Sequence, residues 1–464
     1  MFAREIYVRR RETLKNAVKS GLLLFLGNEE SPMNYPANQY PFRQDSSFLY
    51  YFGLDAPGLG AVLDVDSGTE TLFGDDPTVA DIVWTGAQPL LRNKAESVGV
   101  SRTLPMASLK ETMITAVRQG RTVQYLPPYR PENILKIEQL LGIHPSFAKE
   151  HASVEFTKAV VAQRSIKAPE EIAEIEKAAA ITCEMQTYAM KTARAGMVER
   201  EIVAAMHGIA LARGGNLAFP IIFSIHGETL HNHYYGNVMQ NGNMVVNDSG
   251  AESELHYAAD LTRTFPVSGR FTDRQKDMYR VVLDAQQKAL DAIKPGVPFR
   301  EIHLLACRTL ASGLKQLGLM KGDVTEAVAE GAHAMFFQCG LGHMMGLDVH
   351  DMEDLGEQHV GYEGLQRSPQ FGLCYLRLAK PLRPGFVVTV EPGIYCIPEL
   401  IDQWKAERKH EQFINYDRLE RYRDFGGIRV EDDVVVTEAG YRLLGTPVPK
   451  TIEEMEAAWV PSNR

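Results

Sequence analysis

Two aspartates in the second half of the sequence have the surroundings and spacing expected of metal ligands. Asp248 follows the apolar run 244–246 and precedes a Ser-Gly pair, a pattern typical of a strand entering a turn. Asp260 lies an even number of residues later, directly before a run rich in β-branched and aromatic residues. If the intervening residues form a hairpin, both side chains lie on one face of the sheet. The pattern therefore predicts that both aspartates bind metal.

Three later segments supply further ligands of suitable types. His343 lies in a stretch punctuated by glycines, where the backbone can come close to another group. Glu391 ends a strand-like run and precedes a Pro-Gly turn, and Glu431 stands inside a β-branched run. A carboxylate buried in such a run is costly unless it is paired or bound to a metal. Each residue alone has a simpler interpretation, as a turn former, a solvated edge or a structural histidine, so the prediction depends on their joint occurrence.

Oxygen-rich ligation with a single nitrogen suits a pair of divalent ions. The predicted ligands are Asp248, Asp260, His343, Glu391 and Glu431. This donor set favours Mn²⁺, with Zn²⁺, Co²⁺ or Fe²⁺ as alternatives, and four carboxylates balance the charge of two dications. Two such ions about 3.5–4 Å apart share a water, lower its pKa and stabilise the tetrahedral intermediate of a hydrolysis. The chemistry predicted is metal-assisted attack on a carbonyl.

The segments that carry these residues resemble the motifs of the pita-bread metallopeptidases. They read NDSG, AADLTRTFP, GLGHMMGLDVHD, VVTVEPGIY and GGIRVEDDVVVTEAG. Within this superfamily the sequence is most similar to the branch of aminopeptidase P and prolidase, because its N-terminal half, notably residues 40–48, resembles that branch's extra domain. The resemblance implies an Xaa-Pro aminopeptidase, which releases the N-terminal residue from peptides with proline in second position.

The resemblance also implies roles for individual residues. The family's metal ligands fall on the five positions already chosen from ligand chemistry, and Glu391 would also pass a proton from the attacking water to the leaving proline nitrogen. His231 and His350 would donate hydrogen bonds to the scissile carbonyl or to the proline end of the substrate, and His233 is a neighbour that could be confused with His231. Arg377 resembles the arginine that prolidases use to hold a free product-side carboxylate.

Two alternatives to an Xaa-Pro aminopeptidase stay open at this point. Arg377 and the insertion 399–425 favour an Xaa-Pro dipeptidase, that is, a prolidase, whereas the N-terminal motif favours the aminopeptidase. The second alternative is a non-catalytic binding protein on the same fold, although every ligand position is present. A creatinase-like amidinohydrolase is a weaker interpretation, because that activity needs no such ligand set.

Periodicity divides the chain into two regions with different folds. Residues 1–155 alternate strand-like runs with helical patterns, which predicts an α/β domain, and they resemble the aminopeptidase P N-terminal domain. In residues 156–464 helices separate groups of strands, which predicts an antiparallel sheet covered by helices. The resemblance makes this the curved sheet of a pita-bread catalytic domain, so the overall class expected is α/β (α+β). Helices are expected at 5–19, 108–119, 131–141, 167–191, 199–213 and 273–293, and strands at 22–26 and 61–65.

Trp84 is the residue of the first region that bears on assembly. Local packing is its expected role, and the alternative, implied by the resemblance, is a lid over the active site of a neighbouring subunit. Because relatives are commonly dimers or tetramers, we expect a homodimer or homotetramer.

Composition restricts the partners and the compartment. The chain of 464 residues carries a net charge of −10, which argues against nucleic acid or an anionic membrane as the main partner. The apolar run 22–26 is too short for the core of a signal peptide, and no later run is long enough to span a membrane. Five cysteines without a C-x-x-C pattern favour a reducing compartment, so the cytoplasm is expected. Cys339 lies close to His343 in sequence, but the oxygen-rich ligand set is complete without it.

Overall fold

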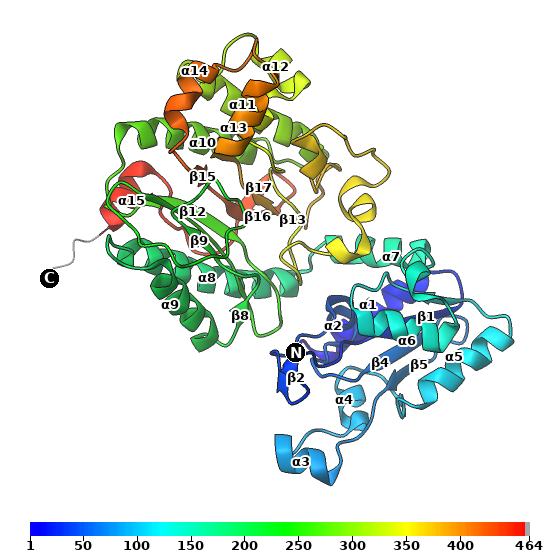
Figure 1. Ribbon diagram of the computed structural model, residues 1–464. Coiled ribbons are helices and arrows are strands. Elements are labelled where there is room, and N and C mark those ends of the chain that lie inside the picture. Colours follow the sequence, from blue (N-terminus) through cyan, green and yellow to red (C-terminus); the bar gives the residue numbers. More distant parts are fainter. Residues whose placement is uncertain (460–464) are drawn as a thin grey trace. The chain divides into compact units, whose positions relative to one another are not determined.

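The computed structural model describes residues 1–459, which form two compact units (Figure 1). The first unit comprises Met1–Arg164 together with Asp354–His359, and the second comprises Ser165–Glu353 and residues 360–459. Among the helices of residues 1–459, none is long and apolar enough to cross a membrane. All five cysteines are unpaired.

The two units divide within helix α7 (Val154–Ser165), because Arg164 is the last residue of the first unit's main segment. The sequence placed the boundary between residues 155 and 156, near the start of the same helix. The later division has a physical reason, since Phe156 is buried and its ring lies 5.1 Å from that of Phe25 in the first unit. Helix α7 therefore contributes to the first unit's core.

A mixed five-stranded sheet with the order β6-β5-β4-β1-β7 forms the centre of the first unit. The apolar strand β1 (Leu22–Leu26) pairs antiparallel with β4 (Gly60–Asp64) and parallel with β7 (Val123–Tyr125). Its burial along nearly its whole length fits a strand covered on both faces. The remaining elements are α1 (Arg4–Ala17), β2 (Pro32–Tyr35), β3 (Asn38–Gln39), α2 (Ser46–Phe52), β5 (Glu70–Phe73), α3 (Val79–Thr85), α4 (Leu91–Ser97), β6 (Arg102–Leu104), α5 (Ser108–Arg118) and α6 (Pro131–Leu141). The α/β prediction for this region is confirmed.

Trp84 does not pack against its own unit. Its side chain is 85% exposed, and helix α3, which carries it, has no buried residue. The expectation of local packing is therefore wrong. A Thr78–Asp81 capping box supports this helix locally in place of core contacts.

Antiparallel strands form the centre of the second unit, as the sequence predicted. One sheet has the order β12-β10-β9 and another the order β13-β16-β17, and two further pairs are β11-β8 and β14-β15. The strands are β8 (Asn216–Leu217), β9 (Ile222–Ser224), β10 (Met244–Ser249), β11 (Ala251–Glu252), β12 (Leu261–Pro266), β13 (Val387–Val390), β14 (Gly393–Tyr395), β15 (Gly427–Arg429), β16 (Asp432–Val436) and β17 (Tyr441–Leu443). Every residue of β10, β12, β13 and β16 is buried, so these strands need cover on both faces.

Helix α8 packs on β10 and β12 and helix α10 packs on β13, and Figure 1 shows the strands between α8 and α9 on one side and α10 and α11 on the other. Helix α8, expected at 167–191, begins with Pro169 at its first position and has Glu170 and Glu171 in its first turn. The helices are α8 (Pro169–Thr192), α9 (Glu199–Ala212), α10 (Asp273–Asp291), α11 (Phe299–Gln316), α12 (Val324–Glu330), α13 (Pro398–Ala406), α14 (Tyr416–Leu419) and α15 (Ile452–Ala458). Helices α13 and α14 lie in the insertion 399–425, for which the sequence indicated little periodicity.

Candidate metal centre

Strand register brings Asp248 and Asp260 together. In β10, Asp248 lies opposite Thr262 of β12, and Asp260 precedes Thr262 by two residues. Because side chains alternate along a strand and opposite residues share a face, both aspartates lie on the same face. Both are buried and line the same cavity. The structure thus places the pair as their even spacing predicted.

A second strand pair brings Glu391 and Glu431 to the same cavity. The last residue of β13, Val390, lies opposite Asp432, the first residue of β16. Continuing this antiparallel register by one residue places Glu391 across from Glu431. Glu431 accepts a hydrogen bond of 2.6 Å from the Thr262 hydroxyl, which connects this strand pair to β12. Four carboxylates from two sheets therefore meet in one place.

His343 completes the cluster. Backbone hydrogen bonds tie the segment 341–345 to β13, and this holds the imidazole over the carboxylates. Its Nε2 lies 3.5 Å from Asp260 Oδ2 and 3.5 Å from Glu391 Oε1. Its Nδ1 lies 3.0 Å from the carbonyl oxygen of Met344, so Nδ1 carries the proton and Nε2 offers its lone pair. This tautomer makes the imidazole a ready metal ligand.

The electrostatics of the cluster fit a cation site. Burial raises the pKa of Asp260 and of Glu431 well above their ordinary values, and neighbouring carboxylates raise both further. Burial also raises the pKa of Glu391 and lowers that of His343 well below its ordinary value, so the imidazole is neutral. One oxygen each of Asp248, Asp260 and Glu431 is buried without a hydrogen-bond partner. Such oxygens are costly to bury unless a cation binds them. The donor set therefore fits divalent metal.

Arg429 belongs to this site, although the sequence analysis did not identify it. Its buried guanidinium lines the cavity, forms an ion pair with Asp248 and donates a hydrogen bond of 2.7 Å to the Tyr395 hydroxyl. It holds the Asp248 carboxylate in place and offsets part of the repulsion within the cluster. The sequence did contain a signal for this residue, since Arg429 stands inside a β-branched run. An arginine in such a run is expected to be buried, and a buried cation requires a buried anion.

Arg263 fixes the chain at Glu431 from within β12. Its buried guanidinium donates 2.6 Å hydrogen bonds to the Glu431 carbonyl and to the Asp432 carboxylate. Arg263→Met is expected to lower the free energy of unfolding by about 3 kcal/mol, because a buried carboxylate loses its main partner. Urea unfolding measures this, with Arg270→Met as a control at an exposed arginine. A loss no larger than that of the control would contradict the positioning role.

A cavity of about 460 Å³ opens onto the carboxylates. Its lining includes His231 and the neighbouring His233, which could be confused with it in the sequence. His231 and His233 each line it, and both side chains are exposed to solvent. Partial burial lowers the pKa of His231, and the nearby Arg429 lowers it further. His231 is therefore a neutral imidazole whose pKa is affected by charged residues of the cluster.

His350 and Arg377 lie on the same cavity and share one carboxylate. The His350 ring lies 4.3 Å from that of His343, and its Nδ1 lies 2.6 Å from Glu353 Oε2. The Arg377 guanidinium lies 3.4 Å from the same Glu353 oxygen. The hydrogen bond from His350 lowers the pKa of Glu353 to about 2, against the effect of burial and with help from Arg377. All eight candidate residues from the sequence thus line one cavity.

Two family models match the sequence. Residues 173–438 match metallopeptidase family M24, and residues 7–124 match the aminopeptidase P N-terminal domain. The first match covers more than half of the chain and includes every candidate ligand.

Known relatives and solved structures match over nearly the whole chain. The Xaa-Pro dipeptidase of Homo sapiens is 32% identical over 462 residues, which cover 95% of this chain and 89% of the relative. The Xaa-Pro aminopeptidase of Escherichia coli K12 is 31% identical over 476 residues, which cover 100% and 99% of the two chains. A structure of zinc-substituted E. coli aminopeptidase P in complex with product has a TM-score of 0.80 at 29% identity, with 98% of both chains covered.

Proposed function

The chain belongs to metallopeptidase family M24 and is a hydrolase of the pita-bread fold, and we propose that it acts as an Xaa-Pro aminopeptidase. The observation that carries the proposal is the convergence of four carboxylates and a neutral imidazole on one cavity. The E. coli Xaa-Pro aminopeptidase and this chain match over almost their full lengths, which supports the same substrate class, peptides with proline in second position.

The proposed ligands are the five residues that the sequence analysis selected, namely Asp248, Asp260, His343, Glu391 and Glu431. Two divalent ions, with Mn²⁺ favoured by the oxygen-rich donors, would supply a water of lowered pKa and a polarised substrate carbonyl. Glu391 takes the proton of the attacking water and passes it to the leaving proline nitrogen.

His231 and His350 orient the substrate by donating hydrogen bonds to the scissile carbonyl or to the proline end. His350→Ala is expected to lower kcat by roughly 10²-fold with little change in Tm, since 31% of the side chain is exposed. Steady-state kinetics and thermal unfolding measure the two effects. His226→Ala, at an exposed histidine that does not line the cavity, is the matched control. An unfolded His350→Ala protein would instead favour a structural role.

A prolidase is the second candidate, since the human relative is an Xaa-Pro dipeptidase and Arg377 lines the cavity. Such an arginine would hold the free carboxylate of a dipeptide. In this chain Glu353 already lies 3.4 Å from Arg377, and this competing carboxylate supports the aminopeptidase.

Hydrolysis of a matched pair of peptides separates the two candidates. The Mn²⁺-loaded protein is expected to cleave Ala-Pro-Phe and to leave Ala-Pro largely intact, with a metal-stripped sample as the control. Preference for the dipeptide would make the enzyme a prolidase. Cleavage of neither peptide with metal bound would contradict both candidates, and failure to bind divalent metal would support the non-catalytic alternative.

The remaining proposals concern the assembly, the compartment and the roles of the two regions. We propose a homodimer or homotetramer in the cytoplasm, where the five unpaired cysteines would stay reduced. We also propose that residues 156–464 form the catalytic domain and that residues 1–155 form the aminopeptidase P-like N-terminal domain. Size-exclusion chromatography with light scattering tests the assembly.

A further inference from the structure

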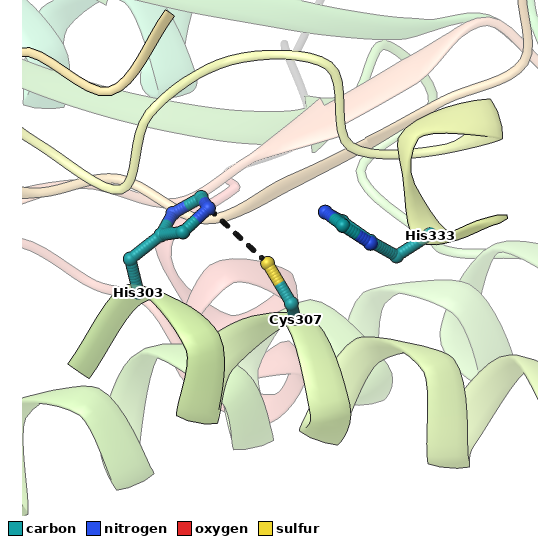
Figure 2. Close-up of side chains that lie close together, drawn as sticks. All are labelled: His303, Cys307 and His333. Carbon is teal, nitrogen blue, oxygen red and sulfur yellow. Dashed lines mark hydrogen bonds between the residues drawn. The ribbon is translucent and has the colours of Figure 1, made fainter. Parts of the chain in front are cut away.

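A second group of metal-binding side chains lies outside the catalytic cavity. His303 and Cys307 are four residues apart on α11, so their side chains share one face of the helix (Figure 2). His333 comes from the short 3₁₀ helix Ala332–Met335. In Figure 2 the Cys307 sulfur lies between the two imidazole rings. The Cys307 Sγ is 3.4 Å from His303 Nε2, and each residue offers a donor atom within 4.8 Å of the other two.

The three side chains are buried, and most of their polar atoms have no partner. Exposure is 0% for His303, 0% for Cys307 and 2% for His333. Neither ring nitrogen of His333 makes a hydrogen bond, nor does Nδ1 of His303. The backbone of Val328 is near His333 and opposes the lowering of its pKa, but it does not reach hydrogen-bond geometry with the ring. Unsatisfied imidazole nitrogens in an apolar core are costly, and a bound ion would satisfy them.

We propose that His303, Cys307 and His333 form a second, structural metal site for a thiophilic ion, Zn²⁺ or Cu⁺. One thiolate and two imidazoles are soft or borderline donors, which these ions prefer, whereas the catalytic cluster contains oxygen donors and one imidazole. The two sites therefore differ in preference, with Mn²⁺ favoured by the carboxylate cluster and a thiophilic ion by the second site. Neither the proposed peptidase activity nor its ligands involve these three residues.

Both histidines are already in the form that binds metal. Burial lowers the pKa of His303 to about 3 and that of His333 to about 4, so both rings are neutral at physiological pH. Binding converts the Cys307 thiol to a thiolate: the S–H bond breaks, a sulfur–metal bond forms, and the proton leaves to solvent. With Cu⁺ the resulting complex is neutral, and with Zn²⁺ it carries one positive charge.

The site would join α11 to the chain that leads into His343. The helix Ala332–Met335 ends eight positions before His343, and the Phe336 carbonyl accepts a 2.8 Å hydrogen bond from the backbone of Tyr395. An ion held by all three residues would fix this approach to the catalytic cluster. Because the donors are buried, we expect the ion to enter during folding and to exchange slowly with chelators afterwards.

Cobalt substitution provides the test, because a thiolate ligand gives Co²⁺ an intense sulfur-to-cobalt charge-transfer absorption. The full-length protein refolded with Co²⁺ is expected to show this absorption, and Cys307→Ser is expected to abolish it. Cys183→Ser is the control, since Cys183 is also buried but its sulfur contacts the Thr446 carbonyl instead. Absence of the absorption in the wild-type protein, or its persistence in Cys307→Ser, would overturn the proposal.

X-ray absorption of the wild-type protein needs no variant and covers the case in which Cys307→Ser does not fold. Protein refolded with equimolar Zn²⁺ and Cu⁺ under reducing conditions is measured at both metal edges. Sulfur in the first shell of either ion supports the site and identifies which of the two it takes. A shell of oxygen and nitrogen alone at both edges would overturn it, and so would loss of the sulfur signal in Cys339→Ser, because Cys339 lines the catalytic cavity.

Discussion

Replacing Glu391 with glutamine is expected to lower turnover by at least roughly 10²-fold while the fold stays intact. Glutamine keeps the size of the side chain but accepts no proton from the attacking water, and it binds a cation more weakly than a carboxylate does. The residue lies 3.5 Å from His343 and accepts a hydrogen bond of 3.4 Å from the Thr389 hydroxyl. The measurement is kcat and kcat/KM on Ala-Pro-Phe, with circular dichroism and Tm as the checks on folding.

Glu438→Gln is the matched control for this experiment, because Glu438 is exposed and does not line the cavity. It should leave turnover unchanged. Near-normal turnover of Glu391→Gln would remove the proton-transfer role from Glu391. A large fall in the Tm of Glu391→Gln would show that the carboxylate stabilises the folded protein. The loss of activity would then not measure the role of Glu391 in catalysis.

Asp260→Asn is expected to lower turnover by at least roughly 10³-fold, because the ions' polarisation of substrate and water is worth several kcal/mol. The same substitution is expected to stabilise the metal-free protein at neutral pH. Burial, and then the charges of Glu431 and Asp248, raise the pKa of Asp260 well above its ordinary value. The folded state therefore disfavours the ionised carboxylate, and asparagine removes this penalty.

The sign of the pH dependence follows from the direction of this shift. A carboxyl whose pKa is raised by folding has no effect on stability below its unfolded pKa. Between the unfolded and the folded pKa it destabilises the protein increasingly as pH rises, and above the folded pKa the effect is constant. In EDTA, the wild-type protein should therefore lose stability relative to Asp260→Asn from about pH 4 upward. With Mn²⁺ the order should reverse. Urea unfolding at pH 5 and pH 8 tests both conditions, and a variant less stable than wild type in EDTA at pH 8 would contradict the account.

Local patterns in the sequence were enough to select the five proposed ligands, which line one cavity. Asp248 and Asp260 stand at the ends of apolar runs with an even separation, and strand alternation then places them on one face. Glu431 was visible because a carboxylate in a β-branched run needs a partner. Residue periodicity located α1, α5, α6, α8, α9 and α10 but not α11, and prolines marked the starts of α6 and α8.

Features that depend on long-range contacts could not be predicted in this way. The pairing of Arg429 with Asp248 joins residues 181 positions apart, and no local pattern indicates it. The same holds for His333, which meets the His303–Cys307 pair only through the packing of its short helix beside α11. The return of residues 354–359 to the first unit is likewise a tertiary contact. Trp84 was misjudged because a large apolar side chain is usually buried, whereas its helix packs on nothing within its unit.

The most direct test of the account is a titration of metal-stripped protein with Mn²⁺, in which bound manganese and hydrolysis of Ala-Pro-Phe are measured on the same samples. We predict no activity without metal and a rise to a plateau at two manganese ions per chain. Because only bound manganese is measured, a thiophilic ion of another metal at Cys307 does not change the number of ions counted per chain. Full activity of the stripped protein, or saturation with Mn²⁺ without any hydrolysis, would contradict the assignment of the carboxylate cluster as the catalytic centre.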